Sequence, residues 1–201
     1  MNNYAKLYNP PKRLLKLLNK LYLRKYKKHK FDIVMSKFHF SVDLSEDECK
    51  QLQKCVPEEV DTISWNLITK AGPPAPTHID RGRKTALQIP VLADPSCHYA
   101  YVLKNENMFD KLVPQENPTG FIQKLDVPWT NQRYPGMPMY HQYEEEYFDV
   151  FPVEPWIPYL NDTSLPHGGL HTKEKYRFFY SFSITERKTV EELKKSFESW
   201  I

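Results

Sequence analysis

The chain is poor in the residues that support several common protein classes. It has three cysteines in 201 residues, Cys49, Cys55 and Cys97, and this small odd number without a CxxC pair argues against a disulfide framework and a cysteine-based zinc site. It also has only six glycines against 17 prolines, a balance typical of short strands and fixed loops rather than long helices. We therefore expect a β-rich chain in a reducing compartment.

Long apolar runs are missing as well. The most leucine-rich stretch, residues 14–23, is interrupted by Lys16 and Lys20, so it can neither span a bilayer nor form the core of a signal peptide. No serine precedes Ser36 in this lysine-rich region, which weakens the interpretation as a transit peptide. We expect a soluble, intracellular, cytoplasmic protein with no transmembrane segment.

Acidic residues are absent before Asp32. Ten lysines and arginines precede it, which leaves 18 basic residues against 25 acidic ones in the rest of a chain whose total net charge is +3. The remainder therefore carries a net charge of −7, and the basic character belongs to residues 1–30 alone.

Leucines in this basic segment repeat with the period of an amphipathic helix over residues 12–30. The helix either packs its leucine stripe on the main domain and solvates its lysines, or it contacts an acidic partner such as nucleic acid or an anionic membrane surface. Both alternatives stay open at the level of sequence. The leucines that define the stripe are Leu14, Leu17, Leu18 and Leu21.

The rest of the chain consists mainly of short β-type segments separated by turn residues. Such strands at intervals of ten to twenty residues favour a jelly roll or a similar double-sheet barrel. We therefore expect two parts, a basic helical N-terminal segment (1–30) and a single mainly β domain (31–201). The strand candidates are residues 31–42, 62–68, 85–91, 97–103, 120–126, 143–151, 156–161 and 176–184.

Two capping boxes indicate the starts of helices, Ser45 with Glu48 and Thr189 with Glu192. The second is followed by an apolar stripe at helical spacing, which predicts a C-terminal helix. The residues of this stripe are Val190, Leu193, Phe197 and Ile201.

A histidine and an aspartate stand one residue apart, His78 and Asp80, between a proline-rich loop and the apolar run at 85–91. Two histidines and one carboxylate form the ligand set of non-haem iron(II) oxygenases, and a pair at a strand end can supply two of these ligands. A His-x-Asp pair alone is weak evidence, because roughly 0.35 occurrences are expected here by chance. The alternative is an Asx turn with an incidental histidine.

A second pair lies further along the chain. His167, in a Pro-His-Gly-Gly turn, precedes by ten residues Arg177, which opens an aromatic strand. A ten-residue return can carry the chain out of one strand, round a glycine turn and back along the neighbouring strand, so the arginine is expected beside the pocket of His167. Such a spacing is expected roughly 0.24 times by chance.

On these two motifs the sequence resembles the iron(II)- and 2-oxoglutarate-dependent dioxygenases with a double-stranded β-helix fold. The resemblance covers about residues 60–185. It implies a mainly β, cupin-like jelly roll with flanking N- and C-terminal α-helices, and a metal site of His78, Asp80 and His167. It also implies that Arg177 pairs with the distal carboxylate of 2-oxoglutarate.

The implied activity is hydroxylation with O2, releasing succinate and CO2 from 2-oxoglutarate. The substrate stays open between a protein side chain, a small molecule and a nucleobase. Two alternatives stay open, a cupin-like metal-binding or ligand-binding protein without turnover and a nucleic-acid-binding protein that acts through residues 1–30. In some members a serine two residues after the arginine also holds the carboxylate; Phe179 stands there in this chain, so that second group is unassigned.

Other histidines and charged residues have simpler interpretations. His98 and His141 are expected to be hydrogen-bonded sheet residues, and His171 lies too close to Arg177 to replace His167. The glutamates within 143–147 are expected to be solvated. The basic residues after Asp80 either attract an acidic substrate or solvate the mouth of the pocket; they are Arg81, Arg83 and Lys84.

Overall fold

The computed structural model describes residues 3–29, 37–41, 44–68, 77–80, 84–111, 139–140, 146–173, 175, 177–185 and 187–201. Its helices are α1 (Lys12–His29), α2 (Glu46–Gln53) and α4 (Val190–Ser196), with 3-10 turns η1 (Glu106–Lys111) and η2 (Glu198–Trp200). Its strands are β1 (Tyr4–Lys6), β2 (Lys37–Ser41), β3 (Val60–Ile68), β4 (Thr77–His78), β5 (Thr85–Leu92), β6 (His98–Leu103), β7 (Met139–Tyr140), β8 (Phe148–Pro152), β9 (Tyr159–Asp162), β10 (His167–His171) and β11 (Arg177–Ile184).

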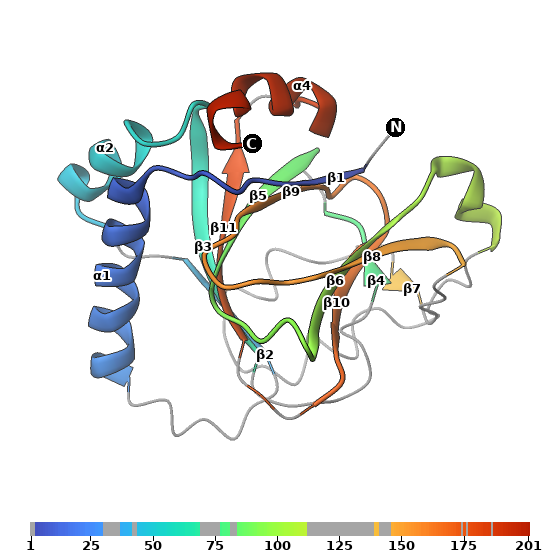
Figure 1. Ribbon diagram of the computed structural model, residues 1–201, viewed down its shortest axis with the longest axis horizontal. Helices are drawn as coiled ribbons and strands as arrows, with labels where there is room; N and C mark the ends of the chain where they lie inside the picture. Colours follow the sequence, from blue (N-terminus) through green and yellow to red (C-terminus); the bar gives the residue numbers. More distant parts are fainter. Residues whose placement is uncertain are drawn as a thin grey trace.

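These strands form two antiparallel sheets that face each other (Figure 1). The six-stranded sheet has the order β1-β9-β5-β11-β3-β2, and the five-stranded sheet has the order β7-β4-β10-β6-β8. From β3 to β6 and again from β8 to β11, the chain passes from one sheet to the other at each successive strand. This alternation is the topology of a double-stranded β-helix, so the predicted jelly roll with helices at both ends is confirmed.

The main hydrophobic core lies on the outer face of the six-stranded sheet, which α1, α2 and α4 cover (Figure 1). Leu14, Leu18 and Leu21 of α1 are at most 1% exposed there, so the prediction that the leucine stripe packs on the domain is confirmed. Burying each such side chain contributes about 1.5 to 3 kcal/mol. None of the helices within the described ranges has the length and apolar character that a membrane-crossing segment needs.

Both predicted capping boxes are present, at the starts of α2 and α4. The expected C-terminal stripe is right for Val190, Leu193 and Phe197, which are buried, but wrong for Ile201, which is 49% exposed. The α-helix ends at Ser196 and continues as the 3-10 turn η2, so helical spacing no longer holds. Trp200 is buried in place of Ile201.

The expectation that His167 lies in a turn was wrong, because His167–His171 is strand β10, paired with β4 and β6. The expectation that Arg177 returns along the neighbouring strand was wrong as well. Its strand, β11, pairs with β3 and β5 in the opposite sheet. The two residues therefore approach each other across the barrel and not along one sheet.

Some sequence predictions lie outside the described residues. These are the strand candidate at 120–126, part of the candidates at 31–42 and 143–151, His141, Arg81 and Arg83.

Candidate functional site

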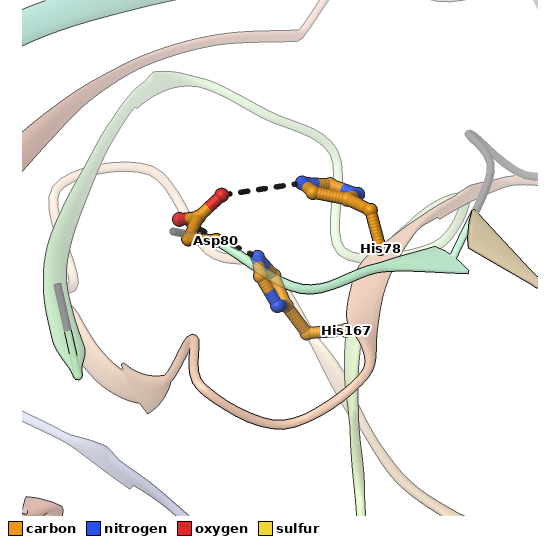
Figure 2. Close-up of side chains that lie close together, drawn as sticks. All are labelled: His78, Asp80 and His167. Atoms are coloured by element: carbon orange, nitrogen blue, oxygen red, sulfur yellow. Dashed lines mark ion pairs between the residues drawn. The ribbon is translucent and has the colours of Figure 1, made fainter. Parts of the chain in front are cut away.

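His78, Asp80 and His167 lie close together (Figure 2). His78 is the last residue of β4 and pairs with His167, the first residue of β10, so both imidazoles project from adjacent strands on one face. Their ring centroids are 4.5 Å apart. Asp80 follows β4 after one intervening residue, and its carboxylate faces both rings.

The distances fit a single metal ion. Asp80 Oδ1 is 3.7 Å from His78 Nε2, and Asp80 Oδ2 is 3.9 Å from His167 Nε2; one ligand atom from each of the three residues lies within 4.8 Å of the others. A six-coordinate ion with bonds of about 2.1 Å separates neighbouring ligand atoms by about 3 Å. A contraction of about 1 to 2 Å would close the three groups on such an ion.

Hydrogen bonds to backbone carbonyls hold the side chain of His167 and the main chain at Asp80. The carbonyl of Leu165 lies 2.9 Å from His167 Nδ1; because a carbonyl only accepts, it holds the proton on Nδ1 and leaves the lone pair of Nε2 toward Asp80. The backbone N–H of Asp80 donates to the carbonyl of Thr163 at 2.8 Å. This bond ties the segment after β4 to the β9–β10 connection.

The site is only partly closed. The side chains of Asp80 and His167 are 10% and 9% exposed, whereas that of His78 is 23% exposed. A ligand therefore has access from the side of His78.

Arg177 projects from β11 into the space between the sheets. It is 2% exposed, and its guanidinium donates to the Tyr159 hydroxyl at 2.8 Å and to the carbonyl of Tyr99 at 3.3 Å. The third guanidinium donor, Nε, is buried without a hydrogen-bond partner. Within the described residues this buried cation has no ion pair; its nearest electrostatic partner there is the Phe179 ring, whose centroid lies 4.6 Å from Cζ of the guanidinium.

Gly169 brings Arg177 onto the same face of β10 as His167. A Cβ at Gly169 would lie 2.8 Å from Arg177 Nη1, so a larger residue here would require the guanidinium to shift. Residues two apart in a strand share a face and are spaced by about 7 Å. The guanidinium beside Gly169 therefore lies about this distance along β10 from the imidazole of His167. The structure thus brings all four residues singled out by sequence to one interior space.

Tyr159 is a site residue that sequence reasoning missed. Burial raises the pKa of its phenol above the ordinary value, so the hydroxyl stays protonated. It accepts from Arg177 Nη2. Its membership of the strand candidate at 156–161 was the available signal, but nothing in the sequence shows that it meets an arginine 18 residues away.

The remaining predicted residues take structural or surface positions. His98 is fully buried and both ring nitrogens are hydrogen-bonded, with the N–H of Asp94 donating to Nδ1 and Nε2 donating to the carbonyl of Lys175. This confirms its interpretation as a satisfied sheet residue. Glu146 is exposed, as expected, and His171 ends β10 opposite His98.

No protein-family model matches this sequence, and no curated protein matches it. Among solved structures, the chain resembles SnoN, described as the non-heme alpha ketoglutarate dependent epimerase from nogalamycin biosynthesis, at 12% identity and a TM-score of 0.49, over 90% of this chain and 77% of that one. It resembles HygX from Streptomyces hygroscopicus, solved with nickel and 2-oxoglutarate bound, at 10% identity and a TM-score of 0.48, over 90% and 81% of the two chains.

A further likeness is to a Pseudomonas putida prolyl-4-hydroxylase, at 8% identity and a TM-score of 0.44, over 94% of this chain and 95% of that one. SnoN is described as alpha ketoglutarate dependent and HygX was solved with 2-oxoglutarate bound; the two names refer to the same compound.

Proposed function

We propose that the protein is an iron(II)- and 2-oxoglutarate-dependent dioxygenase that hydroxylates its substrate with O2. The observation that carries the proposal is the pairing of two unlike groups on one interior face. One is a triad of metal-type ligands. The other is Arg177 of β11, which is buried without an ion pair among the described residues and whose guanidinium lies against Gly169, two residues from His167 along β10.

In this proposal His78, Asp80 and His167 hold the iron. Two imidazoles and one carboxylate on one side of the ion leave the opposite coordination positions open, which suits iron(II) that must also bind a chelating ligand and O2. The Leu165 carbonyl keeps His167 in the tautomer that a ligand needs.

Arg177 would hold the far carboxylate of 2-oxoglutarate. A carboxylate in a fork with the guanidinium would compensate the buried charge and satisfy the orphaned Nε. Tyr159, already bonded to Arg177, would donate its phenolic proton to the same carboxylate. It thereby takes the place of the second carboxylate-binding group that the sequence left unassigned.

The chemistry supplied by the bound iron and 2-oxoglutarate is the oxidative decarboxylation that yields succinate and CO2 and oxidises a C–H bond of the substrate. The residues of this chain bind and orient the two cofactors and keep water from the buried end of the pocket. The more exposed side of His78 is where the substrate would enter. Its chemical class stays open between a protein side chain, a small molecule and a nucleobase.

A cupin-like binder without turnover would use the same triad but has no need of Arg177. Burying an arginine without an ion pair among the described residues costs free energy, and a metal ion held by the triad does not neutralise its charge. Nucleic-acid binding through residues 1–30 would use only the exposed lysines of α1, which include Lys12, Lys16 and Lys20. Neither alternative accounts for an arginine and a triad on one face.

The test is an anaerobic titration of the metal-free protein with iron(II) and then with 2-oxoglutarate, followed by visible absorption of the iron chelate. We expect a weak charge-transfer band in the wild type and none in the His78→Ala, His167→Ala double variant. Admission of O2 should then release succinate.

Lys20→Ala, on the exposed face of α1, is the matched control and should retain the band. If the wild type shows no band, or if the double variant retains it in full, the site assignment is wrong. If the band forms but no succinate appears with O2, the cupin-like alternative replaces the enzyme.

A further inference from the structure

Helix α1 carries charge of one sign only. Of its 18 residues, eight are lysine or arginine and none is aspartate or glutamate. Helices α2 and α4 differ, because α2 contains the ion pair Lys50–Glu46 at 2.5 Å and α4 contains the ion pair Lys194–Glu191 at 3.3 Å. Pairs of opposite sign stabilise an exposed helix, whereas like charges four residues apart destabilise it. Helix stability therefore does not explain the composition of α1.

The exposed lysines of α1 form a row. Helix α1 makes up one side of the molecule (Figure 1), and Lys12, Lys16 and Lys20 are exposed on it at intervals of four residues, so the row is about 12 Å long. Among the described residues, α1 forms an ion pair through Arg24, which contacts Glu48 of α2 at 2.8 Å, but none through these three lysines. Their charge is therefore available to an anionic partner.

A leucine lies among these lysines. Leu23 is 44% exposed, and it follows the fully buried Leu14 by nine residues, or two and a half helical turns, so it points away from the core. It follows Lys16 by seven residues and Lys20 by three, spacings that place it on the same side of the helix. We call this side the outer face of α1, and its defining residues are Lys12, Lys16, Lys20 and Leu23.

The leucine indicates which kind of anionic partner fits the outer face. Contacts to a nucleic-acid backbone come from charged and hydrogen-bonding side chains, and an exposed leucine adds nothing to them. A lipid surface offers anionic headgroups and, just beneath them, hydrocarbon that an apolar side chain can reach. The mixture of lysines with Leu23 therefore favours a lipid surface.

We propose that the outer face of α1 binds a membrane surface with anionic headgroups. The lysines contact the headgroups, and Leu23 reaches the boundary of the acyl chains. Residues 31–201 carry a net charge of −7 and are repelled by such a surface, so the molecule binds with α1 toward it. This inference does not depend on the proposed function, because α1 covers the outer face of the six-stranded sheet whereas His78 and His167 belong to the other sheet.

The test is cosedimentation of the protein with vesicles of phosphatidylcholine containing about 30% phosphatidylserine, and with vesicles of phosphatidylcholine alone. We expect binding to the anionic vesicles that weakens with added salt, and little binding to the neutral ones. Each lysine near an anionic surface raises the partition coefficient about 5-fold. The triple variant Lys12→Gln, Lys16→Gln, Lys20→Gln should therefore bind the anionic vesicles about 100-fold more weakly.

Leu23→Gln keeps the charge and removes the apolar contact. It should weaken binding to the anionic vesicles about 3-fold to 10-fold. The melting temperatures of this variant and of the triple variant should be no lower than that of the wild type, because Leu23 is outside the core and the triple variant loses like-charge repulsion along the helix. Weaker binding then reports the surface and not the fold.

A second triple variant is the matched control for net charge. Lys54→Gln, Lys173→Gln and Lys195→Gln remove the same charge from exposed positions outside α1, and this variant should bind the anionic vesicles within about 3-fold of the wild type. If the wild type does not bind these vesicles, or if both triple variants lose affinity equally, the inference is wrong.

A short DNA duplex at the same salt concentration tests the other kind of polyanion. If the α1 triple variant loses affinity for the duplex while Leu23→Gln binds anionic vesicles as tightly as the wild type, the outer face is a nucleic-acid surface and the membrane assignment is overturned. Duplex binding that is unaffected by the α1 substitutions, together with weaker vesicle binding in Leu23→Gln, supports the membrane assignment.

Discussion

Gly168 and Gly169 are consecutive in β10 and therefore face opposite sides of the five-stranded sheet. A Cβ at Gly169 would crowd the Arg177 guanidinium at 2.8 Å, whereas a Cβ at Gly168 would lie 2.3 Å from the hydroxyl oxygen of Tyr101. The two glycines are required for different reasons, one by the pocket and the other by the packing of the opposite face.

Alanine substitutions should separate these two requirements. Gly169→Ala should displace the guanidinium and weaken 2-oxoglutarate binding about 10-fold, with metal affinity unchanged. Gly168→Ala should destabilise the fold by about 1 to 3 kcal/mol through overpacking but leave the affinity for 2-oxoglutarate near the wild-type value. Calorimetry and urea unfolding of both variants provide the check, and equal effects on affinity would contradict the assignment of faces.

At the residue level the sequence predicted the four polar residues that the structure brings together, because each stands beside a recognisable strand or turn. It did not predict Tyr159. The importance of this residue depends on which face of β9 is turned inward and on which side chain lies opposite. That information comes from register and sheet pairing, which local patterns do not contain.

Elements with local signals were predicted best. The capping boxes of α2 and α4 and the leucine stripe of α1 depend on contacts within a few residues or on a simple period. Strand β10 was taken for a turn because glycines normally weaken strands. Here they are required by the close approach of Tyr101 and Arg177, which only the folded structure reveals.

Packing of α1 gives a stability prediction at this scale. Leu18 is fully buried against the six-stranded sheet, and its replacement by alanine should lower the free energy of unfolding by about 2 to 5 kcal/mol. Lys20, two residues away and exposed, should change it by less than about 0.5 kcal/mol when replaced by alanine. Chemical denaturation of the two variants measures both. Similar losses would mean that α1 is not held by its leucine stripe.

His98 connects the turn before β6 to the segment before β11, through Asp94 and Lys175. Burial lowers the pKa of this imidazole in the folded protein, whereas an unfolded histidine titrates near pH 6.5. Below that pH the unfolded chain binds a proton that the folded protein does not. Stability should therefore fall as the pH drops from about 6.5 toward the lower folded pKa, by up to about 1.4 kcal/mol per pH unit.

Urea unfolding of the metal-free protein between pH 7.5 and 5.5 measures this effect. His98→Gln retains a donor for the carbonyl of Lys175 but cannot titrate, so its stability should be lower at pH 7.5 and depend less steeply on pH. Carboxylates with lowered pKa, such as Glu58, act at lower pH and are common to both proteins. Parallel pH profiles would rule out His98 as the source.

At the scale of the whole molecule, the proposed ligands join the two sheets. His78 and His167 come from β4 and β10 of the five-stranded sheet, whereas Arg177 comes from β11 of the six-stranded sheet. A metal ion alone would connect only His78, His167 and Asp80. A chelated dicarboxylate that reaches Arg177 would connect the two sheets across the barrel interior. The hydrogen bonds of strand pairing join strands within each sheet and do not make this connection.

Thermal stability should therefore rise in two steps. A ligand that binds only the folded state stabilises it by about 2.7 kcal/mol at a concentration 100 times its Kd, so Mn(II) should raise the melting temperature and 2-oxoglutarate should raise it again. In Arg177→Gln the metal step should persist and the second step should be lost. In His78→Ala with His167→Ala both steps should vanish, since the chelate has no ion to bind. A second step of wild-type size in Arg177→Gln would show that the cosubstrate does not reach β11, and that the buried arginine serves the fold alone.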